Sequence, residues 1–220
     1  MGCTNLVSVQ LHEGLQRIES NAFLGCTSLE SIIVPSTVRV IGANIFSGCT
    51  SLERVQLFEG LQRIEQNVFH GCKSLESITI PSTVRVIGED AFRDCNVLES
   101  ALLQQGLERI ELHAFCRCES LDSITIPLTV QEIGGYAFIG CTNVVSVQLQ
   151  ERLESIESHA FWGCKSLERI TIPSTVRVIG DHAFSGCTSL ESVQLFEGLE
   201  EIRWDAFCRC ESLDSICQSD

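Results

Sequence analysis

The sequence lacks the features that mark membrane-spanning and secreted proteins. It contains no run of about 18 apolar residues, so we expect no insertion into a membrane. It has no Asn-x-Ser/Thr sequon, and residues 1–5 lack the basic start and apolar stretch of a secretory signal. These absences favour the cytoplasm as the default location. The cell surface is the alternative if the chain is a fragment of a longer adhesin.

Basic residues are scarce as well. Lys and Arg number 15 against 29 Asp and Glu, which gives a formal net charge of -14. Nucleic acids and anionic membranes attract basic surfaces and repel acidic ones, so neither is expected as the main partner. A protein partner, favourably a basic one, is predicted instead.

Motifs for catalysis are also missing. The sequence has no G-x-S-x-G, no glycine-rich phosphate loop and no H-E-x-x-H. These motifs position a nucleophile, a phosphate group and a zinc ion, respectively. We therefore predict a protein that is not an enzyme and that uses no cofactor.

The prolines are few, and they are evenly spaced. All four, Pro35, Pro81, Pro127 and Pro173, are 46 residues apart. Ten of the 13 cysteines are 23 residues apart, namely Cys3, Cys26, Cys49, Cys72, Cys95, Cys118, Cys141, Cys164, Cys187 and Cys210. A fixed period of this length marks a repeat architecture. At 23 residues per repeat, the 220 residues make about 9.5 repeats. Residues 1–220 are thus predicted to form a single solenoid.

Each repeat contains one strand-like segment. In Leu75 to Ile80, the last residues alternate between apolar and polar, which is the period of a strand buried on one face. A strand that recurs every 23 residues pairs with its neighbour in parallel, which predicts a long parallel sheet. A second apolar pair such as Val38 and Ile41 follows, and the Ala-Phe stretch is too short for more than one 3₁₀ or α turn. Eight inward columns per repeat predict a core that only stacking completes. Glycines that recur at 46 residues, Gly42, Gly88, Gly134 and Gly180, are interpreted as backbone turns.

The repeat unit resembles the BspA-like, or Treponema pallidum-type, leucine-rich repeat. The resemblance rests on the pattern C-x-x-L-x-x-I-x-I-P-x-x-V-x-x-I-G-x-x-A-F, seen clearly in Ile80 to Phe92, and it covers essentially the whole chain. It implies a right-handed, curved solenoid with the main sheet on the concave side and short strands or 3₁₀ turns on the convex side. It also implies adhesin or protein-binding roles, without known catalytic residues.

Two exposed columns are the best candidates for binding. The outward mid-strand column is mainly Gln and Thr, and curved solenoids use this concave face for partners. With the interrupting apolar residues and two arginines from the adjacent column, the candidates are Ile33, Arg54, Gln56, Thr79, Leu102, Thr125, Gln148, Arg169, Thr171 and Gln194. A neighbouring column forms an acidic edge of Glu30, Glu53, Glu76, Glu99, Asp122, Glu168 and Glu191. Stacked like charges repel by about 1 kcal/mol per pair in water. The edge is interpreted either as a solvated stripe that prevents aggregation or as a rail for a basic partner or Ca²⁺.

Cysteine and histidine could also carry chemistry. The cysteine ladder is predicted to be reduced and buried, because free Cys packs as a small apolar residue. Cys116, Cys208 and Cys217 lie outside the ladder and are predicted to be exposed thiols. His113, His159 and His182 share one column, near Asp181 and Asp205. Since Asn, Asp and Tyr fill the rest of that column, we favour a generic polar loop position over a metal site.

The two ends and four aromatic residues are further apolar surfaces. The terminal repeats stop in mid-repeat without capping units, which is expected to expose Leu6, Val9, Leu11, Leu213 and Ile216 and to favour end-to-end self-association. Phe58, Phe196, Trp162 and Trp204 are expected to be exposed on the rims and back. Three functions stay open: a protein-interaction scaffold, a fragment of a surface adhesin or structural array, and a regulatory region of a larger protein.

Overall fold

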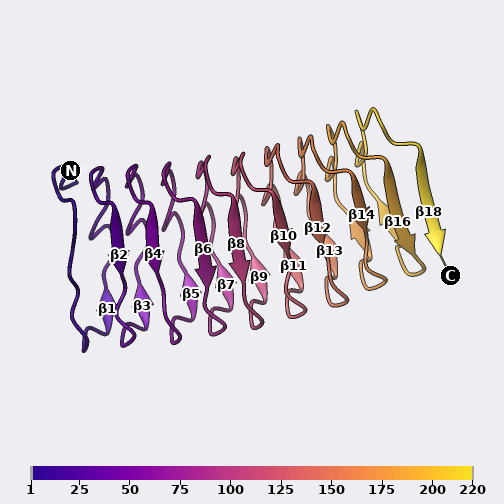
Figure 1. Ribbon diagram of the computed structural model, residues 1–220. Coiled ribbons are helices and arrows are strands. Elements are labelled where there is room, and N and C mark those ends of the chain that lie inside the picture. The colour runs from indigo at the N-terminus through magenta and orange to yellow at the C-terminus, as the bar shows by residue number, and fades with distance from the viewer. Residues whose placement is uncertain (1, 220) are drawn as a thin grey trace.

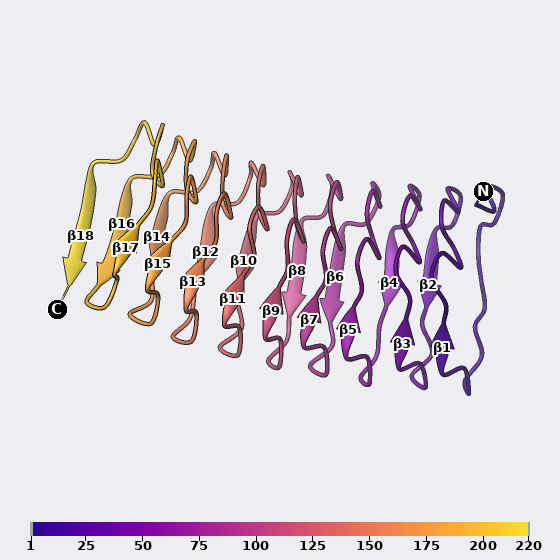
Figure 2. The ribbon, with the colours of Figure 1, turned by 180° about the vertical axis from the view of Figure 1, so that it is seen from behind.

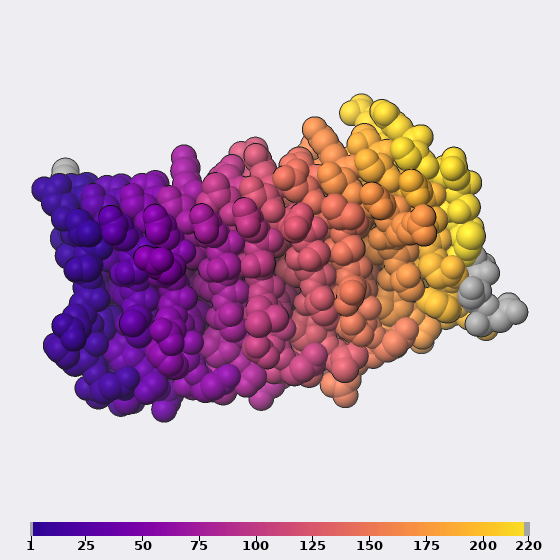
Figure 3. Space-filling model, in the orientation of Figure 1, coloured from indigo at the N-terminus to yellow at the C-terminus, as the bar shows by residue number. Residues whose placement is uncertain are grey.

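The structure, a computed structural model, describes residues 2–219, of which the last two are described by their backbone alone. The chain winds as a solenoid from its N-terminus at one end to its C-terminus at the other (Figure 1). Side chains fill the space between successive coils, so the molecule is a continuous rod (Figure 3). The described residues contain no helix that is long and apolar enough to cross a membrane.

Two rows of parallel strands line the rod, and the strands of one row point in the opposite direction to those of the other (Figures 1 and 2). The longer strands are β2 (Ser31–Ile33), β4 (Arg54–Gln56), β6 (Ser77–Ile80), β8 (Ser100–Leu103), β10 (Ser123–Thr125), β12 (Ser146–Gln148), β14 (Arg169–Thr171), β16 (Ser192–Phe196) and β18 (Ser215–Ser219). The two-residue strands are β1 (Arg17–Ile18), β3 (Val40–Ile41), β5 (Arg63–Ile64), β7 (Val86–Ile87), β9 (Arg109–Ile110), β11 (Glu132–Ile133), β13 (Ser155–Ile156), β15 (Val178–Ile179) and β17 (Glu201–Ile202). We call the outward side of the first row the long-strand face.

The register of both rows follows the 23-residue repeat. Ile124 of β10 pairs with Val147 of β12, and Ile133 of β11 pairs with Ile156 of β13. The predicted parallel sheets are therefore present, and they keep equivalent residues of neighbouring repeats side by side.

Hydrogen bonding between neighbouring long strands is uneven along the rod, and β16 is well bonded to both β14 and β18. β2 pairs with β4 and β6 pairs with β8, but β4 is not bonded to β6, nor β8 to β10, and β12 meets β14 at one position only. In each weak junction the second repeat has a proline just after its strand, at Pro81, Pro127 or Pro173. Proline has no N–H to donate back to the preceding strand, so the ladder stops there.

The core consists of the eight predicted columns. In one central repeat they are Cys72, Leu75, Ile78, Ile80, Val84, Ile87, Ala91 and Phe92, each at most 4% exposed. The phenylalanines stack from Phe23 through Phe207, with ring centroids 5.0–5.8 Å apart and nearly parallel planes. Each repeat thus covers the apolar face of the one before it.

The Ala-Phe stretch forms single turns, as predicted. Backbone bonds of the i→i+3 type, such as Leu24 N–H to the Asn21 carbonyl at 3.1 Å, close these turns. The residue before Ala-Phe has a left-handed backbone in every repeat, for example φ 54° at Asn67 and 55° at His113. That residue begins the turn, and a second left-handed residue directly after the turn, such as Gly25 with φ 66°, ends it before it can continue as a helix.

The glycines at 46-residue spacing have a different role from the one predicted. Gly42, Gly88, Gly134 and Gly180 do not have a positive φ. A Cβ at Gly88 would lie 2.8 Å from the carbonyl oxygen of Ile64, and one at Gly180 would lie 2.6 Å from the backbone nitrogen of Ser158. Glycine is required there because the backbone of the preceding repeat passes too close for a side chain.

Repeats with proline alternate with repeats that have Glu-Gly, Gln-Gly or Glu-Arg at the same turn. Ser82, in a proline repeat, donates from its backbone N–H and its hydroxyl to the Glu59 carboxylate at 3.1 and 3.0 Å, and Thr83 Oγ1 accepts from the Gly60 N–H at 2.8 Å. On the other side, Arg85 donates to the Gly106 carbonyl at 3.0 Å. These bonds give the 46-residue period its physical basis, because each type of turn bonds to the other type.

Candidate functional site

The long-strand face presents the predicted mid-strand column to solvent. Gln56, Thr79, Thr125, Gln148 and Thr171 are exposed, and Gln194 is half-buried and donates to the Cys217 carbonyl at 3.3 Å. Ile33 and Leu102, which interrupt the column, are 59% and 57% exposed. With this exposure both side chains are available for contact with a partner.

Shallow hollows separate the outward side chains of this face. Ile33, Arg54 and Gln56 border a hollow of about 400 Å³, and Gln56, Thr79 and Leu102 border one of about 540 Å³. A third, of about 290 Å³, lies among Gln148, Arg169 and Thr171. The hollow beside Leu102 spans the junction where β4 and β6 are not bonded. The structure thus brings the predicted face residues together in small groups along the rod.

The two arginines of this face differ in their surroundings. Arg169 lies 3.4 Å from the Glu191 carboxylate, so it neutralises part of the acidic edge. Arg54 has no ion pair within the described residues. The guanidinium of Arg54 is the more available of the two.

The acidic edge is exposed along its whole length. Glu30, Glu53, Glu76, Glu99, Asp122, Glu168 and Glu191 all lie in solvent. Backbone bonds set their spacing, as in Glu53 N–H to the Glu30 carbonyl at 2.9 Å and Glu99 N–H to the Glu76 carbonyl at 2.8 Å. A row of carboxylates held at strand spacing has a negative potential that attracts cationic groups.

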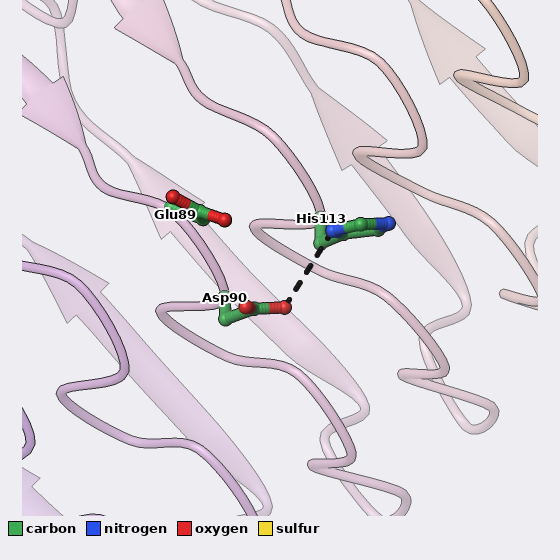
Figure 4. A group of neighbouring side chains, drawn as sticks. All are labelled: Glu89, Asp90 and His113. Atoms are coloured by element: carbon green, nitrogen blue, oxygen red, sulfur yellow. Dashed lines mark ion pairs between the residues drawn. The ribbon is translucent and has the colours of Figure 1, made fainter.

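One group of side chains has ligand atoms close enough to hold a cation. Atoms of Glu89, Asp90 and His113 lie within 4.8 Å of one another, on adjacent repeats (Figure 4). Asp90 Oδ1 lies 3.8 Å from His113 Nδ1 but also 3.2 Å from Arg93 Nη1. The arginine competes with any cation for this carboxylate, so we treat the group as an ion-pair network. Among the histidines considered from sequence, only His113 belongs to it.

The histidine column continues as a row of rings. His159 lies between Tyr136 and His182, with ring centroids 4.5 and 4.8 Å away, and Trp204 meets His182 edge-on at 4.7 Å. Burial and the neighbouring His182 lower the pKa of His159, while Asp181 opposes the shift. Stacking explains this column, as its generic polar or aromatic character suggested.

A scan of known families assigns the repeat. The BspA type leucine rich repeat region matches residues 1–122 and 108–219, in six copies. The chain belongs to this family. No curated protein matches it.

Several solved structures share the BspA-type fold. A leucine-rich repeat protein from Bacteroides ovatus is 28% identical, with a TM-score of 0.72, over 93% of this chain and 59% of its own length. The leucine-rich repeat protein of T. pallidum is 32% identical, with a TM-score of 0.57, over 81% of this chain and 74% of its own. The pneumococcal vaccine antigen PcpA, at 21% identity and a TM-score of 0.56, shares the fold over 93% of this chain and 60% of its own. This chain therefore spans about three fifths of the B. ovatus protein.

The prediction of buried, free thiols is confirmed for most of the BspA-type cysteine ladder but is wrong for its first member, Cys3, which is exposed in the first repeat. Cys26 to Cys187 are buried, and Cys210 is half-buried. From Cys49 onward, each ladder thiol donates to the carbonyl of the phenylalanine 26 residues earlier, at 3.0–3.3 Å. Burial raises the pKa of Cys49 and of Cys95 to about 12, which leaves the thiolate scarce. The ladder is part of the core and has no reactive role.

The prediction for the cysteines outside the ladder was wrong in part. Cys217 is exposed, but Cys208 is half-buried and Cys116 is buried at 4% exposure. Cys116 lies near the charged groups of Arg93, Asp94 and Arg117. Burial raises the pKa of Cys116 as well.

The remaining apolar candidates divide in the same way. Trp162 and Trp204 are exposed as predicted, whereas Phe58 and Phe196 are half-buried. Near the ends, Ile216 is 48% exposed. Leu6, Val9, Leu11 and Leu213 are half-buried against the core.

Proposed function

We propose that this BspA-type chain is a protein-interaction scaffold whose long-strand face binds an extended polypeptide with basic residues. The observation that carries the proposal is the pair of exposed aliphatic side chains, Ile33 and Leu102, each beside a hollow in an otherwise polar face. Apolar side chains of a partner would fill these hollows, and the acidic edge next to them supports a cationic partner.

The column itself supplies the test variants. Thr79 and Thr125 occupy the equivalent position in other repeats. Ile33→Thr and Leu102→Thr should therefore leave the fold intact. The matched control is Leu128→Ser. Leu128 is 53% exposed in a proline turn, away from this face, and Ser occupies the equivalent position at Ser36 and Ser82.

The experiment selects binders from a displayed library of random linear peptides and measures their affinities for each variant. We expect selected peptides to combine Lys or Arg with apolar residues. The double variant Ile33→Thr/Leu102→Thr should weaken them at least tenfold, since burying an aliphatic side chain contributes about 1.5–3 kcal/mol. Added salt should weaken them further, because screening reduces attraction to the acidic edge. Equal affinity for wild type and the double variant, or an equal loss in Leu128→Ser, would refute the proposed face.

A further inference from the structure

A further hollow lies away from the long-strand face, on the turns that carry the ladder cysteines. Its volume is about 680 Å³, within the range of small-ligand sites. It occupies the C-terminal half of the rod, among the turns along the upper edge of Figure 1. Nothing in the binding role proposed for the long-strand face involves these residues.

A run of glycines forms the floor of this hollow. Gly140, Gly163 and Gly186 occupy the same position of three successive turns, with φ of 72°, 71° and 75°. Arg117 and Arg209 occupy that position in the turns on either side, with φ of 57° and 59°. Three turns that lack a side chain at this position, between two turns that have a long one, make a recess, which we call the glycine trough.

The floor of the trough offers no free hydrogen-bond donors. The N–H groups of Gly140, Gly163 and Gly186 donate to carbonyls of the next repeat at 2.8–2.9 Å. A ligand seated on the glycines would therefore meet a weakly polar backbone surface, and an extended peptide would find no backbone N–H there to pair with. Polar recognition must come from the walls.

The walls carry three cationic and three anionic side chains. Arg117, Lys165 and Arg209 are the cations, and Glu119, Asp205 and Glu211 are the carboxylates. Lys165 and Arg209 have no ion pair within residues 2–219, and the nearest carboxylate to Arg117 is that of Asp94, at 3.9 Å. Their donors and acceptors are thus available. A formally neutral lining does not favour a polyanion or a metal ion, each of which needs an excess of one sign.

An indole ring lies in the middle of the trough wall. Trp162 lines the hollow and is 43% exposed, while Ser185 at the equivalent position of the next turn is small and buried. Thr142 and Thr188 add hydroxyl groups along the same wall. Indole offers a flat apolar surface beside these polar groups.

We propose that the glycine trough binds a neutral oligosaccharide. Sugar hydroxyls both donate and accept, which suits a lining that carries both cationic and carboxylate side chains, and the C–H face of a sugar ring packs on indole. Arg117 and Arg209 are four repeats apart, which at about 4.8 Å per strand spacing is roughly 19 Å. That length fits a chain of several sugar units better than a single one.

The repeats again supply variants that preserve the fold. Residues 162–167 and 70–75 are identical except that Trp162 replaces His70, so Trp162→His removes only the indole. Gly163→Arg introduces a residue that Arg117 and Arg209 already carry at this position with a similar φ, and it fills the trough. Gly48→Arg makes the same change at an equivalent turn outside the trough, where φ is 71°. Trp204→Ser removes the more exposed tryptophan, which is not part of the lining but contacts the lining residue His182 edge-on at 4.7 Å, and it isolates the fluorescence of Trp162. Ser20 and Ser158 occupy the position of Trp204 in other repeats.

The test begins with the full chain on an array of neutral, uronic-acid and sulfated oligosaccharides, followed by calorimetric titration of the neutral glycans retained. We expect Trp162→His and Gly163→Arg to lose at least tenfold in affinity, and the control Gly48→Arg to match wild type. In Trp204→Ser, Trp162 is the sole tryptophan, so its emission should change on binding. Unchanged melting temperatures establish that each variant is folded. Retention of acidic glycans alone, of no glycan, or undiminished binding by Gly163→Arg would overturn the proposal.

Discussion

The stacked phenylalanines allow a quantitative test of how the rod is held together. Phe115 is fully buried, with Phe92 and Phe138 stacked on its two faces at 5.0 and 5.2 Å. Phe23, in the first repeat, is half-buried and has one ring neighbour, Phe46, at 5.8 Å. Replacing each by Ala compares an interior position of the same column with a terminal one.

The interior change should cost about twice as much. Truncating a fully buried Phe to Ala lowers the free energy of unfolding by about 3–5 kcal/mol, through lost transfer energy and the cavity left behind. Stacking adds about 0.5–1.5 kcal/mol per ring pair, and Phe115 loses two pairs whereas Phe23 loses one. For Phe23→Ala, with half the burial, we expect about 1–2.5 kcal/mol. The terminal repeat can also unfold locally without disturbing the rest.

The measurement is urea unfolding under reducing conditions, followed by circular dichroism and by tryptophan fluorescence. Two probes are needed because repeat proteins can unfold in parts. Trp162 and Trp204 report on the C-terminal half, so Phe115→Ala should shift both signals and Phe23→Ala mainly the first. Phe115→Leu, which retains more volume, is the control and should cost less. If Phe115→Ala cost no more than Phe23→Ala, the account of a continuous stacked core would be wrong.

Three further expectations concern thiols, pH and close backbone contacts. In the native state a thiol reagent should label Cys3 and Cys217 first, while Cys49 and Cys95 react only after unfolding; mass spectrometry of labelled peptides decides this, and early labelling of Cys95 would contradict its burial. Because the folded-state pKa of His159 lies below its ordinary 6.5, the unfolded chain binds the proton more readily. Stability should then fall as the pH drops through about 6.5, and His159→Asn should reduce that fall in melting temperature. Gly88→Ala should cost about 1–3 kcal/mol in urea unfolding by overpacking against Ile64, and a neutral result would contradict the close approach.

Much of the fold could be predicted because the constraint recurs in every repeat. The columns that contain Cys72, Leu75 and Phe92 repeat so regularly that the inward and outward positions follow from the period alone. Two effects of the neighbouring repeat could not be seen within one unit. Pro81 interrupts the bonding of the strand before it, and Gly88 is needed because of the backbone near Ile64. Both depend on which atoms of adjacent coils approach each other.

The surface was less predictable than the core. The outward position of Ile33 and Leu102 follows from strand alternation, and the exposed fractions agree. Cys116 was misplaced because its column also holds His70 and Arg93, a mixture that indicates exposure, whereas a short side chain there is covered. The glycine trough has a counterpart in the sequence, namely two copies of Cys-Arg-Cys-Glu four repeats apart. In the three repeats between them, glycine occupies the position of the arginine. Its meaning requires knowing that this position has a left-handed backbone and faces solvent.

The alternation of turns with proline and turns without it limits how such a chain can change its length. Deleting residues 118–163 would leave the Gln105-Gly106 turn between two proline turns, with Pro173 in the place of Pro127, and should give a shorter rod with intact junctions. Deleting residues 95–117, a single repeat, would instead place the Pro127 turn directly after the Pro81 turn. Arg85 would then lose its acceptor, the Gly106 carbonyl. The strand β6 would also have a weakly bonded junction on both sides, with β4 and with β10. Gain or loss of 46 residues is therefore tolerated by this architecture, and gain or loss of 23 is penalised.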